Sequence, residues 1–92
     1  MQVALLTLDF HLEGCRSLKE KRRRLGGLKD RFGRLSNVAT CESAYPDQWG
    51  KAQWCFVCVG PNKAAVQSTC ALIQEYASQL DAVLYQQQLE YL

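Results

Sequence analysis

Every second residue from Ala4 to Leu12 is apolar, and the residues between them become polar from Thr7 onward. Successive side chains of a strand point to opposite faces, so this period of two predicts a β-strand. One face is wholly apolar and is expected to meet the core, whereas the other becomes polar toward its end and is expected to be partly open to water. The apolar set is Ala4, Leu6, Leu8, Phe10 and Leu12, and the other set is Val3, Leu5, Thr7, Asp9 and His11.

The period then changes to that of a helix, which is predicted to start at Ser17 and to end near Leu35. Ser17 followed by Glu20 is a capping box, a pattern typical of a helix start. Lys21 interrupts the apolar stripe in the first turn, where its long stem can reach water. The pair Gly26–Gly27 lies in the middle and costs about 1 kcal/mol per glycine relative to alanine, so it indicates either close packing or a bend. The stripe consists of Leu18, Leu25, Leu28, Phe32 and Leu35.

Three strands and a second helix are predicted in the rest of the chain. Residues 37–44 and 51–59 form two strands separated by a proline-containing turn, because proline fixes its own backbone angle and restricts its predecessor. Asn62 can cap a helix that runs to about Leu80. Residues 82–92 return to strand periodicity.

This order, β-α-β-β-α-β, predicts a single domain over residues 1–92 of the α+β class. It is the ferredoxin-like split βαβ arrangement, with a four-stranded antiparallel sheet and both helices on one face. Right-handed crossovers place the first and third strands at the centre. The other face of the sheet stays open and is an obvious surface for binding or dimerisation.

The 92 residues have ordinary globular composition, with 48% hydrophobic and 22% charged residues. No apolar run approaches the roughly 18–20 residues of a membrane span, and the Val3–Leu8 run lacks the features of a signal peptide. A cytoplasmic protein without membrane contact is therefore expected. The five cysteines are odd in number, which argues against a disulfide framework, and most are expected to fill the core.

Charge is distributed unevenly although the net charge is only +2. Residues 16–34 carry nine Lys or Arg and two acids, a net +7, whereas the remainder carries two bases and seven acids, a net −5. Such asymmetry favours a nucleic-acid contact, because phosphate binding needs several cationic heads presented together. The alternative is a solvated helix face, partly neutralised by Glu20 with Arg24 and by Asp30 with Arg34. The candidate nucleic-acid-binding residues are Lys19, Lys21, Arg22, Arg23, Arg31 and Arg34.

Two motifs of the third strand are weaker candidates. Trp54 and Phe56 faintly resemble the aromatic strand of RNA-recognition motifs, where rings stack on bases, but core packing is the favoured interpretation. Cys55 and Cys58 form C-x-x-C, and their odd separation on a strand points the two thiols to opposite faces. No metal site is therefore expected, since no second ligand pair follows.

Asp9 and His11 share the open face of the first strand, and Glu42 on the second strand could join them across the sheet. Such a polar cluster could perform acid-base chemistry, because histidine titrates near neutrality. No nucleophile and no glycine-rich phosphate loop accompanies it, so a hydrogen-bonded polar cluster at a strand end is favoured. We expect neither enzymatic activity nor a cofactor.

The run Ser17-Leu18-Lys19-Glu20-Lys21-Arg22, four residues after His11-Leu12, resembles the signature of the bacterial YlxP-like proteins of unknown function. The resemblance spans essentially the whole chain. This sequence departs from the family pattern in its large number of cysteines and in the Gly26–Gly27 pair. It implies a ferredoxin-like fold. It also implies an RNA- or ribosome-linked role, because genes of the family often lie near those for translation initiation and ribosome maturation. Further residues that fit are Glu42, Asp47, Trp49, Leu84 and Tyr85.

Two functions are thus expected. The first is a non-catalytic RNA- or ribosome-associated module that binds through the basic helix. The second is a protein-interaction module that forms a homodimer, or binds a protein partner, through the open sheet face or an exposed edge strand.

Overall fold

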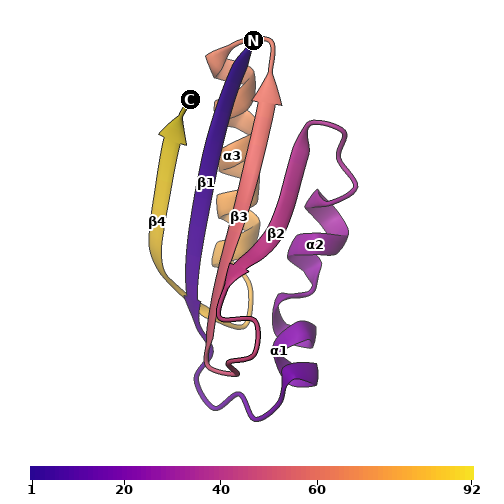
Figure 1. The fold of residues 1–92 in the computed structure, drawn as a ribbon, viewed down its shortest axis with the longest axis vertical. Helices are drawn as coiled ribbons and strands as arrows, with labels where there is room; N and C mark the ends of the chain where they lie inside the picture. Colours follow the sequence, from indigo (N-terminus) through magenta and orange to yellow (C-terminus); the bar gives the residue numbers. More distant parts are fainter.

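The computed structural model describes residues 1–92 and has the predicted order of elements, with one addition (Figure 1). The first predicted helix is divided into two, so that three helices accompany four strands. The strands are β1 (Gln2–His11), β2 (Val38–Ala44), β3 (Lys51–Gly60) and β4 (Val83–Tyr91), and the helices are α1 (Leu18–Leu25), α2 (Gly27–Phe32) and α3 (Lys63–Ser78).

The four strands form one antiparallel sheet in the order β2-β3-β1-β4, which confirms the ferredoxin-like prediction. β1 and β3 lie at the centre and pair without interruption from Gln2 opposite Gly60 to His11 opposite Lys51. Both outer pairs contain a register shift, between Asp9 and Phe10 for β4 and between Glu42 and Ala44 for β2.

The core lies between the sheet and the helices. In the view of Figure 1, α3 lies behind β1 and β3, and α1 and α2 lie to the right, beyond β2. The predicted apolar face of β1 is completely enclosed, because a strand between two neighbours and under a helix has no contact with water on that face. The buried residues of β1 and its extension are Ala4, Leu6, Leu8, Phe10 and Leu12, and those of α3 are Val66, Cys70, Ile73 and Ala77.

Both predicted helix starts are confirmed by their caps. The Ser17 hydroxyl accepts a hydrogen bond from the Glu20 amide at 3.0 Å, and the Glu20 carboxylate accepts one from the Arg16 amide at 3.3 Å. The Asn62 side chain accepts one from the Ala65 amide at 2.9 Å. These bonds satisfy amides that have no partner within the helix.

The glycine pair both interrupts the basic helix and allows close packing. α1 ends at Leu25 and α2 begins at Gly27. A Cβ atom on Gly27 would overlap the Tyr76 hydroxyl of α3, so α3 approaches the backbone there more closely than any side chain permits.

The helical segment also ends earlier than predicted, at Phe32, and Leu35 is 42% exposed rather than part of the buried stripe. No helix combines the length and the apolar character that crossing a bilayer requires.

Candidate nucleic-acid interface and the adjoining groove

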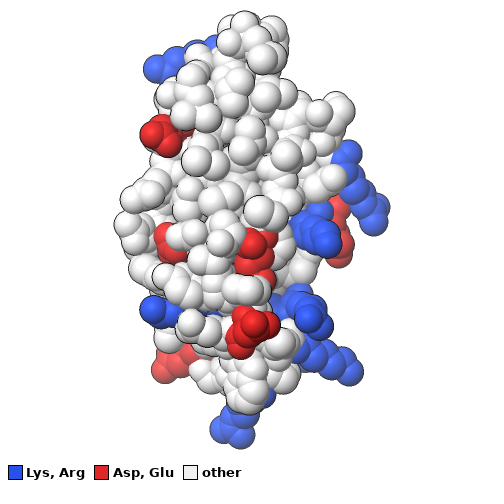
Figure 2. Space-filling model, in the orientation of Figure 1, with Lys and Arg blue, Asp and Glu red and all other residues white.

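Five of the six basic residues predicted to bind nucleic acid are exposed. They share the flank of the molecule formed by α1 and α2, where Figure 2 shows most of the blue side chains on the visible face. None of the five forms an ion pair. We call them the basic surface: Lys19, Arg22, Arg23, Arg31 and Arg34.

Of the two neutralising pairs predicted along the helix, one forms. Arg24 lies 3.4 Å from the Glu20 carboxylate, as the i,i+4 spacing predicts, but Asp30 and Arg34 do not pair. Arg24 also donates to the backbone carbonyl oxygens of Asp81 (2.7 Å) and Glu13 (3.1 Å). It therefore ties α1 to two loops and does not belong to the basic surface.

The Glu20 carboxylate is held in its charged form. A side-chain hydrogen bond from Cys15 is the largest cause that lowers its pKa, and bonds from the Arg16 amide and Arg24 act in the same direction. The acid that begins α1 thus stays ionised and supports the helix N-terminus.

Arg31 is oriented by two aromatic rings. Its guanidinium carbon lies 5.1 Å from the Tyr76 ring centroid and 5.7 Å from that of Phe32, within the range of cation–π attraction. The two rings meet edge to face at 5.5 Å. Arg31 remains exposed while its position is restrained, which reduces the entropy lost when it binds an anion.

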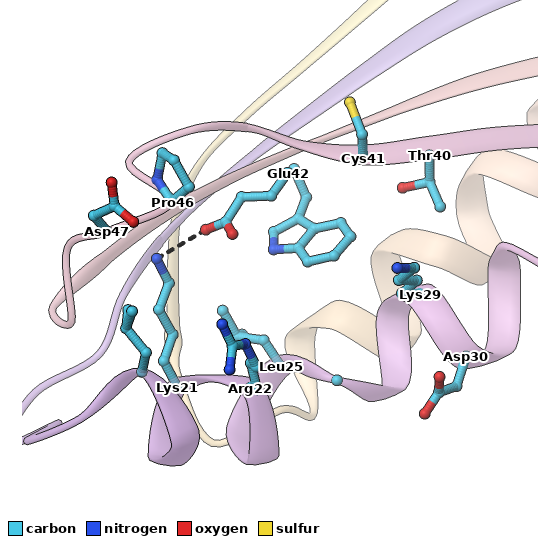
Figure 3. A pocket seen from close by; sticks show the side chains of 13 residues that line it. Lys21, Arg22, Leu25, Lys29, Asp30, Thr40, Cys41, Glu42, Pro46 and Asp47 are labelled. Atoms are coloured by element: carbon cyan, nitrogen blue, oxygen red, sulfur yellow. Dashed lines mark ion pairs between the residues drawn. The ribbon is translucent and has the colours of Figure 1, made fainter.

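The prediction that Lys21 binds nucleic acid is wrong, because Lys21 is only 4% exposed. Its ammonium nitrogen Nζ lies 2.8 Å from Glu42 Oε2 (Figure 3). It also donates hydrogen bonds of 2.7 Å to the carbonyl oxygens of Tyr45 and Gln48. A buried ammonium group needs such partners, because moving a charge out of water without new hydrogen bonds or an ion pair costs much free energy. Lys21 therefore stabilises the fold, and its ammonium group is not available to bind a phosphate.

Lys21 clamps a turn with an unusual backbone. Tyr45 has φ of 63°, in the left-handed region that non-glycine residues rarely adopt. The two bonds from Lys21 bracket the turn on both sides of Pro46. The Lys51 ammonium nitrogen lies 5.2 Å from the Tyr45 ring centroid and holds that ring as well.

A groove of about 600 Å³ lies between the α1–α2 segment and the edge strand β2 (Figure 3). It exists because the backbone of α1 stands away from the strands and contacts α2 instead. Its rim carries both signs of charge, with Arg22 and Lys29 beside Asp30 and Asp47. Arg22 belongs to both the groove and the basic surface.

Trp54 lines the groove on the helix side of the sheet, and Phe56, two residues along β3, is completely buried in the core on the same side. The favoured core interpretation of this aromatic strand is therefore confirmed, and the two rings do not form a stacking platform on the open face. The indole nitrogen of Trp54 is buried and has no hydrogen-bond partner. In the strand register Trp54 stands opposite Glu42, so the side chains are neighbours on this wall.

The predicted polar cluster of Asp9, His11 and Glu42 does not form. Asp9 is 7% exposed on the open face and accepts a 3.0 Å hydrogen bond from Gln53. Glu42 points to the opposite side of the sheet, toward Lys21, because it pairs with Trp54 and successive strand positions alternate between faces. His11 is exposed at the end of β1.

The two thiols of the C-x-x-C motif point to opposite faces, as the odd spacing predicted. Cys55 Sγ donates to the Ser43 hydroxyl at 3.1 Å on the open face, whereas Cys58 is completely buried in the core. Burial, with a smaller contribution from neighbouring Cys70, raises the pKa of Cys58 to about 12. No group of three or more His, Cys, Asp or Glu side chains is arranged to hold a metal ion.

Sequence reasoning missed the groove and the clamp around Lys21. The signal for the clamp was the position of Lys21 on the apolar stripe, where a lysine needs either a route to water or buried partners. The groove had no local signal, because it depends on the distance between a helix and a strand.

Residues 3–87 match the model of a family described as "Protein of unknown function (DUF503)". No curated protein matches the chain.

Proposed function

This chain belongs to the DUF503 family of unknown function, and from that premise we propose that it is a non-catalytic, cytosolic module that associates with RNA or the ribosome through its basic surface. The observation that carries the proposal is the basic surface, whose five cations are exposed and form no ion pair. The resemblance of Ser17–Arg22 to the YlxP-like signature supports the same function.

The charge distribution favours phosphate over other acidic partners. The five cations follow the α1–α2 segment, and helices present Lys and Arg heads to solvent as a fixed array. Contacts to about five phosphates release condensed counterions. The logarithm of the binding constant should then fall with the logarithm of salt concentration with a slope of about −3.5 for single strands and −4.5 for duplexes.

The test is co-sedimentation of the protein with ribosomes and with separated subunits at low and high salt, using the wild type and Arg22→Glu/Arg23→Glu. Lys51→Glu/Lys63→Glu is the matched control, because it makes the same change of charge at exposed sites away from the basic surface. We expect salt-sensitive binding that is lost only in the first variant. Equal loss in both variants, or no binding by the wild type, would contradict the proposal.

A second candidate function is protein interaction through the open sheet face. The observation that favours it is the uncharged upper part of that face in Figure 2, above the acidic side chains of its lower half. The apolar residues at the start of β1 and the end of β3 are neighbours in the strand register. Val57 is 38% exposed there, and Val3 and Leu5 are partly buried beside it. Val57→Lys should abolish partner binding under this alternative and leave ribosome binding unchanged under the first.

A further inference from the structure

The outer edge of β4 has no partner in this chain. β4 pairs with β1 on one side only, and most of its residues are exposed. It contains no lysine, arginine or proline, and Glu90 is its only charged residue. Natural proteins usually protect an edge of this kind with such residues, because unpaired backbone groups bind other strands.

The opposite edge of the sheet is protected. β2 is flanked by α2, and the Val38 amide donates to the Leu35 carbonyl oxygen at 3.4 Å. The two edges therefore differ, because α2 covers the start of β2 whereas β4 pairs with β1 alone and most of its residues are exposed.

The register identifies which backbone groups of β4 point outward. The Leu92 amide donates to the Val3 carbonyl oxygen at 2.9 Å, so residue 92 points toward β1. Because these directions alternate along an antiparallel pair, the backbone groups of Gln87, Leu89 and Tyr91 point away from β1.

The register shift limits the regular part of this edge. Asp9 stands opposite Gln86 but Phe10 stands opposite Leu84, so Tyr85 is the extra residue of a bulge. Regular pairing is left to residues 86–92. The centre of that segment is Leu89, whose backbone groups point outward.

We infer that a second copy of this chain pairs antiparallel with β4, about a two-fold axis at Leu89, and extends the sheet across both copies. In this register Leu89 meets its own symmetry mate, Gln88 stands opposite Glu90, and Gln87 opposite Tyr91. A glutamine amide can donate to the carboxylate, and no two like charges face each other. The strand is thus complementary to itself, as a two-fold interface requires.

The inference of this dimer does not rest on the proposed function. The dimer would, however, change how the protein binds RNA. α1 and α2 lie on the side of the sheet away from β4 (Figure 1), so the two basic surfaces would occupy opposite ends of the dimer. Two linked surfaces bind one large RNA more tightly than either alone.

The first experiment is light scattering coupled to size exclusion, without RNA, across the micromolar to millimolar range. The wild-type mass should rise toward twice the 10.4 kDa of the chain. Leu89→Lys places two like charges on the axis, and Gln87→Pro removes an outward amide while leaving the β1 bonds intact. Both should remain monomeric with an unchanged circular dichroism spectrum.

Val57→Lys, on the open face, is the matched control and should dimerise like the wild type. A cross-link test checks the register, since Leu89→Cys should form a disulfide in which peptide mapping finds two copies of position 89. A wild type that is monomeric at every concentration overturns the inference. So does a dimer that Val57→Lys dissociates and Leu89→Lys does not.

Discussion

The ammonium nitrogen of Lys21 lies 2.8 Å from Glu42 Oε2, joining the first turns of the basic helix to the edge strand β2. The lysine side chain is 5% exposed and the glutamate side chain 22% exposed, so the pair is largely removed from water. Together with the two carbonyl oxygens of the β2–β3 turn, it ties α1 to β2 and to the turn that follows β2.

Replacing Lys21 with methionine should destabilise the protein strongly. Methionine has similar length but leaves the Glu42 carboxylate without its buried partner, which typically costs about 3–5 kcal/mol. We expect a value near 3 kcal/mol, because Glu42 keeps some contact with water. Urea unfolding measures the loss, and Lys21→Met/Glu42→Leu should recover part of it. If the double variant is as unstable as the single one, the ion pair is not the cause.

Gly27→Ala should destabilise the protein although alanine is the better helix former. The new methyl group would overlap the Tyr76 hydroxyl, and overpacking of this kind costs about 1–3 kcal/mol. Tyr76→Phe removes that hydroxyl, so the cost of Gly27→Ala should shrink in the Tyr76→Phe background. Thermal unfolding of the wild type, the two single variants and the double variant gives the coupling free energy between the two positions. If the two destabilisations simply add, the proposed contact is contradicted.

Alkaline pH should unfold the protein partly through Cys58. Burial raises its pKa from the ordinary 9.0 to about 12, so the unfolded thiol loses its proton at a lower pH than the folded one. The stabilisation is complete below pH 9 and is lost as pH rises toward 12. Unfolding measured over that window should show a shallower fall for Cys58→Ala than for the wild type. An identical pH dependence would exclude this thiol as a cause.

Single charge removals should separate binding residues from structural ones. Arg23→Gln removes one exposed cation, so the magnitude of the salt-dependence slope for RNA should fall by about 0.7–0.9. The neighbouring Arg24→Gln should leave the slope unchanged, because Arg24 is occupied with Glu20, Asp81 and Glu13. Filter binding at several salt concentrations measures both slopes. If both substitutions reduce the slope equally, the assignment of Arg23 but not Arg24 to the basic surface is wrong.

Much of the fold followed from local patterns. The period of two in β1 correctly named its buried face, and Ser17 and Asn62 marked the two helix starts. These features depend on neighbouring residues alone. The end of the basic helix did not follow, because Leu35 has the right spacing but the segment stops at Phe32 and leaves it exposed.

The candidate site was predicted less completely. Exposure of Arg22 and Arg23 followed from helical spacing, whereas the partners of Lys21 lie 21 or more residues away and no periodicity indicates them. Asp9 and Glu42 could be assigned to strands but not to a common face, since that depends on the register between strands.

By itself, the sequence determined the order of elements, the apolar faces and the concentration of positive charge on one segment, because each is set by residue type and local spacing. Only the tertiary structure decided that Lys21 is buried against Glu42, that Tyr76 requires a glycine at position 27, and that β4 leaves its edge uncovered. These relationships arise where distant segments meet, and the distances between them are set by the packing of the whole core.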